Sequence, residues 1–368
     1  MNFFGLLKKL SLLALALLFP LSVFAQTFSD VPTYHKHYKS IASLSSAGVI
    51  NGYPDKKFRP YKTINRAEAV KILSTAQFND SAINGCIAEY TASHWHYAFF
   101  KDVLIKNTWY SKYVCAARTN NVVDGYPDGL FRPGNTINFA EGLKVIIEGY
   151  GIDVSSEKFS ENSLLYVNGD EWFAPYFAYA YSKNLINRNK FYHPAQSMTR
   201  GEFIEIIHRI KTVKNGGLTE FSSASTTYSS EYTITIPRLN IVNLNVSFAD
   251  LYNESAALAT LKDGLGHYMN PPGDGKKVVI FGHSSGYSWD KSAYKRALRK
   301  INKLQDGDRI YINYQEKGYV YQVSSREIIA ANQAHTVLQD FNYEEVALYT
   351  CWPPDSIRQR YVVYAVKI

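Results

Sequence analysis

The chain has little cysteine, no dense block of one charge and only one long apolar run. Without a basic block or a recognisable module, nothing in it indicates nucleic-acid binding. After Phe24, no segment is apolar enough to cross a bilayer. The cysteines are Cys86, Cys115 and Cys351, and an odd count leaves one thiol unpaired. Because Cys351 stands alone near the C-terminus, it is the expected free thiol.

Composition indicates a folded protein of two or three domains. The 368 residues exceed one ordinary domain, and an apolar fraction of 46% with 20% charged residues supports a packed core. The net charge of +8 includes Lys8 and Lys9, so residues 26–368 carry 8 − 2 = +6. So modest a surplus fits attraction to an anionic polymer or an ordinarily solvated surface equally well.

The N-terminus predicts export. Lys8 and Lys9 precede an apolar run over residues 10–24 that contains Pro20, and residues 23–25 suit a cleavage site. We expect a signal peptide over residues 1–25 and a mature chain that begins at Gln26. The alternative is an uncleaved anchor, although a bilayer span needs roughly 20 apolar residues and this run is shorter.

An internal repeat organises the N-terminal half. Residues 52–55 read Gly-Tyr-Pro-Asp and residues 58–60 read Phe-Arg-Pro, and both motifs recur at residues 125–128 and 131–133. A weaker third copy begins at residue 192. Each copy predicts a helix-loop-helix unit, because a capping box and apolar residues at helical spacing follow the loop. The expected caps pair Asn65 with Glu68, Asn138 with Glu141, and Thr199 with Glu202.

These copies resemble S-layer homology repeats. Residues 28–31 and 100–103 match the opening motif, the Gly-Tyr-Pro-Asp loops match the middle, and residues 65–68 and 199–202 match the Thr-Arg-Ala-Glu close. The resemblance covers residues 27–212, as repeats at about 27–77, 98–150 and 165–212. It implies an all-α, pseudo-threefold domain that binds anionic, often pyruvylated, cell-wall polysaccharide and so holds the chain at the cell surface.

The resemblance also implies a set of polysaccharide contacts. Arg66 and Arg200 occupy the closing-motif arginine position, and a guanidinium presents several donors to a carboxylate. Asp30 and Asp102 are weaker candidates. Phe139 replaces the arginine in the second repeat, so one groove is expected to be degenerate. The alternative is that both arginines only form surface ion pairs.

Cys86 and Cys115 flank the opening of the second repeat. Outside the cell we expect a disulfide between them. The alternatives are two buried thiols or a metal site, for which no partner residues are evident.

A Gly-, Ser- and Thr-rich stretch at residues 213–230 predicts a linker, and the character then changes to short β-strands. Expected strands lie at 233–236, 242–246, 278–281, 309–314, 318–323, 346–349 and 361–366, with a helical crossover at 291–303. Many short strands indicate a small barrel or sandwich.

Three residues at strand ends carry candidate chemistry. His283 ends the apolar strand at 278–281, Cys351 ends the strand at 346–349, and Arg360 opens the last strand. A cysteine nucleophile needs a thiolate, an imidazole that exchanges protons, and a cation at the oxyanion. These three residues supply that set.

Residues 231–368 resemble the sortases in residues 236–239, expected on the first strand, in the corner at Gly282 and His283, in the turn at Gly307 and Asp308, and in Thr350-Cys351 followed by Arg360. The resemblance implies an eight-stranded β-barrel and a transpeptidase with Cys351 as nucleophile, His283 as acid and base, and Arg360 as oxyanion stabiliser. Expected partners are surface proteins with a Leu-Pro-x-Thr-Gly-like sorting motif and an amine acceptor, either a peptidoglycan stem peptide or a pilin lysine. No cofactor or metal is expected.

The sequence departs from the sortase pattern at Ala347 and at residues 352–354, which puts the subclass and the substrate site in doubt. Arg358 and His267 are rivals of Arg360 and His283, and His267 lies in a turn-rich segment. Two other functions remain open: a non-catalytic surface-layer protein with a degenerate barrel, and an L,D-transpeptidase, whose Ser-His-Gly-Cys motif residues 349–352 do not match.

Overall fold

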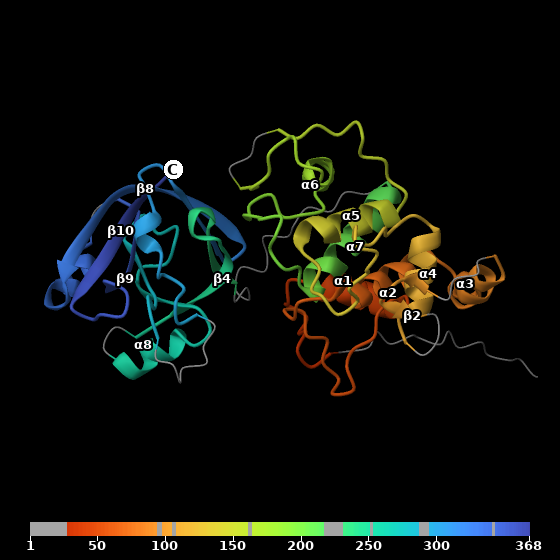
Figure 1. Cartoon of the computed structure of the whole chain (residues 1–368), viewed down its shortest axis with the longest axis horizontal. Helices are drawn as coiled ribbons and strands as arrows, with labels where there is room; N and C mark the ends of the chain where they lie inside the picture. The colour runs from red at the N-terminus through yellow and green to blue at the C-terminus, as the bar shows by residue number, and fades with distance from the viewer. Residues whose placement is uncertain are drawn as a thin grey trace, which may run out of the picture.

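The computed structural model describes residues 28–93, 98–104, 108–160, 164–216, 231–250, 253–286, 294–340 and 343–368. The expected signal peptide and most of the linker lie outside these residues. A helical part and a β-barrel stand side by side (Figure 1). Within the described ranges, every helix is too short or too polar to cross a membrane.

Three capping boxes start the main helices of the helical part. α2 (Arg66–Gln77), α5 (Phe139–Gly149) and α7 (Arg200–Lys214) each begin after an Asn or Thr whose side chain accepts a bond from the backbone N–H of the glutamate three residues on. The glutamate side chain accepts a bond from the backbone N–H of the cap in return. These are the caps that the sequence predicts. The preceding helices are α1 (Tyr38–Ser46), α4 (Ser111–Thr119) and α6 (Ala174–Ser182).

The three units close into a ring through backbone hydrogen bonds. The first two N–H groups of each main helix donate to the loop of the next unit: α2 to the second loop, α5 to the third and α7 back to the first. The donor–acceptor pairs are Arg66 to Asn135 and Ala67 to Pro133, Phe139 to Gln196 and Ala140 to Pro194, and Arg200 to Lys62 and Gly201 to Pro60, at 2.8–3.1 Å. This cyclic pattern confirms three repeats with pseudo-threefold symmetry.

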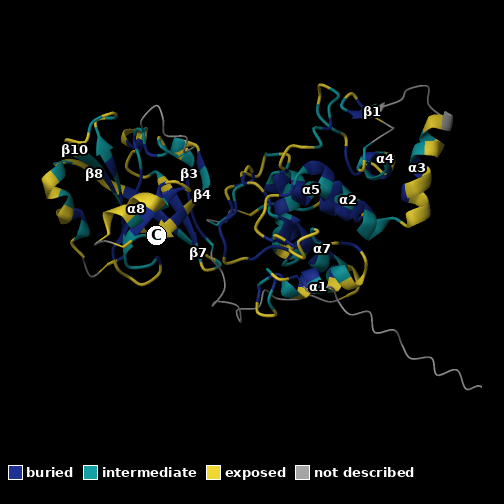
Figure 2. Cartoon of the chain, turned by 90° about the horizontal axis from the view of Figure 1, so that it is seen from below, coloured by how far each residue is buried: buried dark blue, intermediate teal, exposed yellow. Residues whose placement is uncertain are grey.

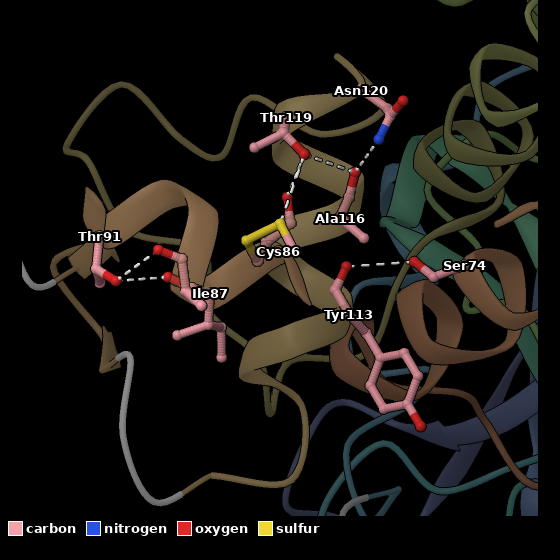
Figure 3. Close-up of a disulfide and its surroundings, with 10 residues drawn as sticks. Ser74, Cys86, Ile87, Thr91, Tyr113, Ala116, Thr119 and Asn120 are labelled. Carbon is pink, nitrogen blue, oxygen red and sulfur yellow. Dashed lines mark hydrogen bonds between the residues drawn. A yellow bond between two sulfur atoms is a disulfide. The ribbon is translucent and has the colours of Figure 1, made fainter. Parts of the chain in front are cut away.

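An additional helix, α3 (Asp80–Ser93), is tied to α4 by the disulfide between Cys86 and Cys115 (Figure 3). The Thr119 hydroxyl lies 3.7 Å from the Cys86 sulfur and donates to the Cys115 carbonyl at 3.0 Å. A two-stranded hairpin, β1 (Ala98–Phe100) and β2 (Val103–Leu104), lies between α3 and α4 in the chain. The expected disulfide is confirmed, and Cys351 is a free thiol.

The C-terminal part is a closed barrel with the strand order β10-β8-β7-β3-β4-β5-β6-β9. Its strands are β3 (Tyr232–Ile236), β4 (Ile241–Phe248), β5 (Leu265–Met269), β6 (Val278–Phe281), β7 (Arg309–Tyr314), β8 (Lys317–Ala330), β9 (Glu345–Trp352) and β10 (Gln359–Lys367). α8 (Glu254–Thr260) and the 3-10 segments η2 (Pro237–Leu239), η3 (Ile301–Lys303) and η4 (Ala331–Leu338) lie between strands. The eight-stranded barrel is confirmed.

Three expectations for the barrel need correction. β5 was not among the predicted strands, and it contains His267, which the sequence placed in a turn-rich segment. The expected helix at 291–303 is instead a series of turns that ends in η3, over the residues from 294 onward that the structure describes. Residues 237–239 form η2 after β3 rather than continuing the strand.

The barrel and the third repeat are in contact. Phe191 stacks on Tyr311 of β7 with ring centres 4.0 Å apart, and both rings are buried together with Val320. The Asn313 side chain exchanges two hydrogen bonds with the backbone of Phe191, at 2.8 and 2.9 Å. In Figure 2 the strands β3, β4 and β7 lie on the side of the barrel that faces the helices.

Candidate active site and repeat grooves

Cys351 and Arg360 are direct partners on neighbouring strands. In the antiparallel pair of β9 and β10, Cys351 lies opposite Arg360, and both side chains are half-buried. Opposite residues in such a pair have Cβ atoms roughly 4.5–5.5 Å apart. Two hydrogen bonds to the backbone hold the Arg360 guanidinium in place: its Nη1 donates to the carbonyls of Ile357 and Gln359, each at 2.9 Å.

His283 reaches the same place from the other side of β9. β6 runs parallel to β9 with Phe281 opposite Tyr349, and the Gly282 N–H donates to the Tyr349 carbonyl at 3.3 Å. The Thr350 hydroxyl donates to the Gly282 carbonyl at 2.6 Å, which ties the two strand ends together. These contacts place the segment that carries His283 beside Thr350, the residue before Cys351.

Alternation along the strands puts these residues on the outer face of the barrel. Val278, Ile280 and Leu348 point into the buried core, so Phe281, Tyr349 and Cys351 point outward. Phe281 lies between two tyrosines, with ring centres 4.4 Å from Tyr268 and 6.0 Å from Tyr349. The thiol therefore stands at the end of an aromatic surface, and burial raises the pKa of Tyr349.

Gly282 allows the corner before His283. A Cβ at this position would overlap a methyl group of Leu265 and lie 3.1 Å from Leu298, so a larger residue would push the corner away from the barrel. The carbonyl of His283 accepts a bond from the Leu298 N–H at 2.9 Å. The backbone that carries the imidazole is thereby held on both sides.

An ion pair that the sequence did not indicate connects the loops around the site. Arg299 donates to both carboxylate oxygens of Asp355, at 3.1 and 2.8 Å, and also to the Ser284 carbonyl at 3.3 Å. The Asp355 N–H donates to the Ser285 hydroxyl at 3.2 Å. The segment after His283 and the connection after Cys351 are thus joined, although neither Arg299 nor Asp355 lies in a recognisable motif.

The two rivals lie elsewhere. His267 is fully buried in β5, no hydrogen bond to either ring nitrogen is present within the described residues, and burial lowers its pKa to about 4. A sealed imidazole of this kind cannot exchange protons with a substrate. Arg358 is exposed in the connection at 353–358 and is not paired with Cys351 in the β9–β10 register. Of these four candidates, Arg360 faces Cys351 across the strand pair, and His283 follows the glycine that is bonded to Thr350.

Arg200 lines a groove of about 390 Å³ on the first repeat, together with Tyr53, Lys71, Trp109 and Tyr113. Its side chain is only 7% exposed. The guanidinium lies 4.8 and 5.0 Å from the ring centres of Phe58 and Tyr53, and its Nε donates to the Phe58 carbonyl at 3.2 Å. The groove of the first repeat therefore takes its arginine from the third.

Arg66 repeats this arrangement on the second repeat. Its Nε donates to the Phe131 carbonyl at 2.8 Å, and the guanidinium lies 4.7 Å from the ring centre of Tyr126 and 4.8 Å from that of Phe131. Glu141 lies 3.6 Å from Arg66 Nη1. Both arginines are thus buried parts of the repeat interfaces, not the exposed ion pairs of the alternative interpretation.

Asp30 and Asp102 hold loops. The two oxygens of Asp30 accept the N–H groups of Phe58 and Arg59, each at 2.7 Å. Asp102 makes the same pair of bonds in the second repeat, at 2.7 and 2.6 Å. These bonds occupy both carboxylates without a ligand, so we leave Asp30 and Asp102 out of the proposed binding site.

Comparison with known proteins assigns both parts. Residues 234–368 match the model of the sortase domain, and residues 27–70 and 99–141 match that of the S-layer homology domain. The surface layer protein of Brevibacillus choshinensis is 26% identical over 159 residues, 42% of this chain and 13% of that protein. The cellulosome-anchoring protein of Acetivibrio thermocellus is 32% identical over 120 residues, 33% of this chain and 25% of that protein. This chain thus spans a minor part of these relatives.

Solved structures of sortases are also similar. Sortase C1 of Streptococcus agalactiae is 25% identical with a TM-score of 0.32, over 37% of this chain and 66% of that one. Sortase A of Corynebacterium diphtheriae is 25% identical with a TM-score of 0.31, over 37% of this chain and 60% of that one. The domain matches, together with the ring of three helical units and the closed barrel, show that this chain joins S-layer homology repeats to a C-terminal sortase domain.

Proposed function

We propose that the barrel is a cysteine transpeptidase that acts on surface proteins with a Leu-Pro-x-Thr-Gly-like sorting motif. The Cys351 thiolate attacks the carbonyl carbon of the threonine, and the new carbon–sulfur bond gives a tetrahedral oxyanion. The Arg360 guanidinium stabilises that oxyanion. The carbon–nitrogen bond then breaks, and the His283 imidazolium gives its proton to the leaving amine.

The second half of the reaction reverses these roles. An amine acceptor, from a peptidoglycan stem peptide or a pilin lysine, attacks the thioester carbonyl, and neutral His283 takes the proton that the amine loses. The carbon–sulfur bond breaks and the thiolate of Cys351 returns. The product is a new amide bond, and every step uses only the side chains of this chain.

The observation that carries this proposal is the strand register around β9. Cys351 pairs with Arg360 on one side of β9, and on the other side Thr350 is bonded to Gly282, the residue before His283. A shift of one residue in either strand would turn a side chain to the opposite face. This register therefore supports the assignment of the three residues to one site.

A trapping experiment tests the assignment. Incubation with a library of sorting-motif peptides should leave an acyl fragment on Cys351, which mass spectrometry of the digested protein locates. Cys351→Ala should lose the adduct and all amide transfer, whereas Arg358→Ala, with an exposed side chain outside the site, should keep both. An adduct on another residue, or transfer by the Cys351→Ala variant at the wild-type rate, would refute the assignment.

We also propose that the repeats attach the chain to anionic polysaccharide of the cell wall through Arg66 and through the groove of Arg200. S-layer homology domains support a location at the cell surface. The groove of Arg200 offers a buried guanidinium, the Lys71 ammonium and the indole of Trp109, which is 54% exposed. Cations and an exposed aromatic ring suit an acidic sugar. Binding of the purified chain to isolated walls should weaken as salt rises; salt-independent binding would contradict this proposal.

A further inference from the structure

The grooves of the repeat ring are built on one plan, but the third differs from the first at two positions. The groove of the first repeat combines Arg200 with Trp109 from the following unit. In the third groove Phe139 stands at the arginine position. Lys36 stands at the tryptophan position, because it precedes the loop of its repeat by the same interval as Trp109 precedes the second loop. The third groove therefore has neither a guanidinium nor an indole at these two positions.

The space that remains in the third groove is small. Its volume is about 30 Å³, against about 390 Å³ in the first. The ring of Phe139 packs 4.7 Å from Tyr192 and 5.9 Å from Phe177, and it fills the place of an arginine side chain. The third groove is thus too small for an acidic sugar and lacks the arginine that would bind its carboxylate.

Carboxylates from the barrel occupy this groove instead. Glu316, in the turn between β7 and β8, lies 2.7 Å from the Lys36 ammonium, and its carbonyl accepts a bond from the Asn187 side chain at 3.2 Å. Glu231, directly before β3, lies 2.7 Å from the Lys190 ammonium and 3.8 Å from Lys36. Lys190 is also paired with Glu202 at 3.0 Å.

This network is largely buried, and each of its two lysines is paired with two of its three glutamates. The side chain of Lys190 is 4% exposed and that of Glu231 is 11% exposed. Burial alone would lower the pKa of Lys190, but Glu231 and Glu202 outweigh it and raise that pKa well above its usual value. Removing one partner of such a cluster leaves an uncompensated buried charge, which is strongly unfavourable.

Apolar and backbone contacts continue the interface around the charges. Phe191, Tyr311 and Val320 form a buried cluster with Leu164 packed against it. The Gly318 N–H donates to the Asn189 carbonyl at 2.6 Å, close to Glu316 in the chain. A Cβ at Gly318 would lie 2.7 Å from the Phe191 nitrogen and 2.7 Å from Leu164, so only glycine allows this close approach.

We propose that the third groove is a docking socket, specific for the β7–β8 turn of the chain's own catalytic barrel, and not a polysaccharide site. This proposal accounts for three features of the groove. It lacks the arginine and the tryptophan, it has Lys36 instead, and a turn that carries a carboxylate lies beside its two lysines. The ring then keeps the positions of Arg66 and Arg200 for the wall and uses the third groove to hold the barrel.

Docking of this kind directs the active site away from the repeats. In the strand order, β7 and β3 are separated from β9 by two or more strands in either direction around the barrel. Figures 1 and 2 accordingly show β10, the partner strand of β9, on the side of the barrel far from the helices. A barrel fixed by its β7 side leaves Cys351 open to substrates while the ring is attached to the wall.

Hydrogen exchange of the full chain tests the socket without any enzymatic activity. The reporters are the N–H groups of Phe191 and Gly318, which bond across the interface. Glu316→Lys should accelerate their exchange at least tenfold. The reversed pair, Lys36→Glu with Glu316→Lys, should restore protection. Gln315→Lys adds the same lysine to an exposed position in the same turn and should leave exchange unchanged. The Val362 N–H, in the pair of β9 and β10, reports whether the barrel stays folded.

Each result decides the question. Fast exchange of both reporters in the wild-type chain would overturn the proposal, as would unchanged exchange in Glu316→Lys or a reversed pair that restores nothing. Because the readout is backbone protection, these outcomes are independent of whether the barrel is a transpeptidase.

Discussion

Replacing Arg200 by alanine should destabilise the repeat ring, because this arginine is part of its packing. The guanidinium is 7% exposed, bonds to the Phe58 carbonyl and stacks on Phe58 and Tyr53. A hydrogen bond from a charged donor contributes about 1.5–3 kcal/mol. Partly desolvated stacking on aromatic rings adds on the order of 1–2 kcal/mol. The free energy of unfolding should therefore fall by about 2–5 kcal/mol.

Calorimetry of the full chain measures this loss. At about 2–4 °C for each kcal/mol in a domain of this size, the melting temperature of the ring should fall by about 5–15 °C. Arg59→Ala is the matched control: Arg59 stacks on the same Tyr53 ring at 4.3 Å and pairs with Asp55, but its side chain is 45% exposed. That variant should melt near the wild-type temperature, since exposed ion pairs contribute little.

Equal melting of the two variants would refute the idea that Arg200 holds the ring together. The result also decides how the groove must be tested. Loss of wall binding in Arg200→Ala would mix damage to the fold with loss of a ligand contact. Arg200→Lys keeps the charge but removes the planar donor fork, so a variant that stays folded and binds the wall more weakly would isolate recognition from stability.

Three further predictions concern the barrel and the disulfide. Arg360→Ala should lower transpeptidation by at least a hundredfold and Arg358→Ala should not, as initial rates will show; similar rates for both would remove Arg360 from the site. Reducing the bond between Cys86 and Cys115, which are 29 residues apart, should cost about 3–4 kcal/mol in denaturant titrations, and an unchanged midpoint would contradict this. Burial lowers the pKa of His267 to about 4, so as the pH falls this histidine is protonated in the unfolded chain before it is protonated in the folded chain. The free energy of unfolding should therefore be unaffected by His267 above about pH 6.5 and should decrease between pH 6.5 and pH 4. His267→Leu should reduce the dependence of the unfolding free energy on pH by up to about 1.4 kcal/mol for each pH unit. An unchanged pH dependence would contradict the lowered pKa of His267.

The helix starts were predictable because each depends on residues close in sequence. Asn65 and Glu68, three positions apart, form their capping box regardless of what packs around them. The strand at 278–281 was predictable for a similar reason: a short apolar run with two buried faces has few other structures open to it. Both were read from local pattern alone.

β5 was missed because its pattern is ambiguous. It places Gly266 and His267 inside the strand, and glycine is depleted in strands. Gly266 is required because a Cβ there would overlap the Phe281 ring, a contact between strands that no local pattern reveals. Because β5 was missed, His267 ranked below His283 for its place in a turn-rich segment, whereas the structure excludes it by burial.

The candidate catalytic residues could be proposed from the sequence, but their arrangement could not. Cys351 and Arg360 are close in sequence and face each other across a short connection, so strand-end positions were enough to propose them. His283 lies far from Cys351 in the sequence and is aligned by a parallel pairing that depends on the closed barrel. The ion pair of Arg299 with Asp355 likewise joins distant segments and carries no motif.

The third groove shows that a departure from a motif can indicate a new function as well as a lost one. From sequence, Phe139 indicated only a degenerate groove, because a missing arginine says what a site has lost. What it gained depends on Glu316, which lies much further along the chain and belongs to the other domain. The contacts of Lys36 and Lys190 with barrel carboxylates turn an apparent defect into an interface. A broken symmetry in a repeat ring therefore marks the position at which to look for a partner, and here the partner is the barrel of the same chain.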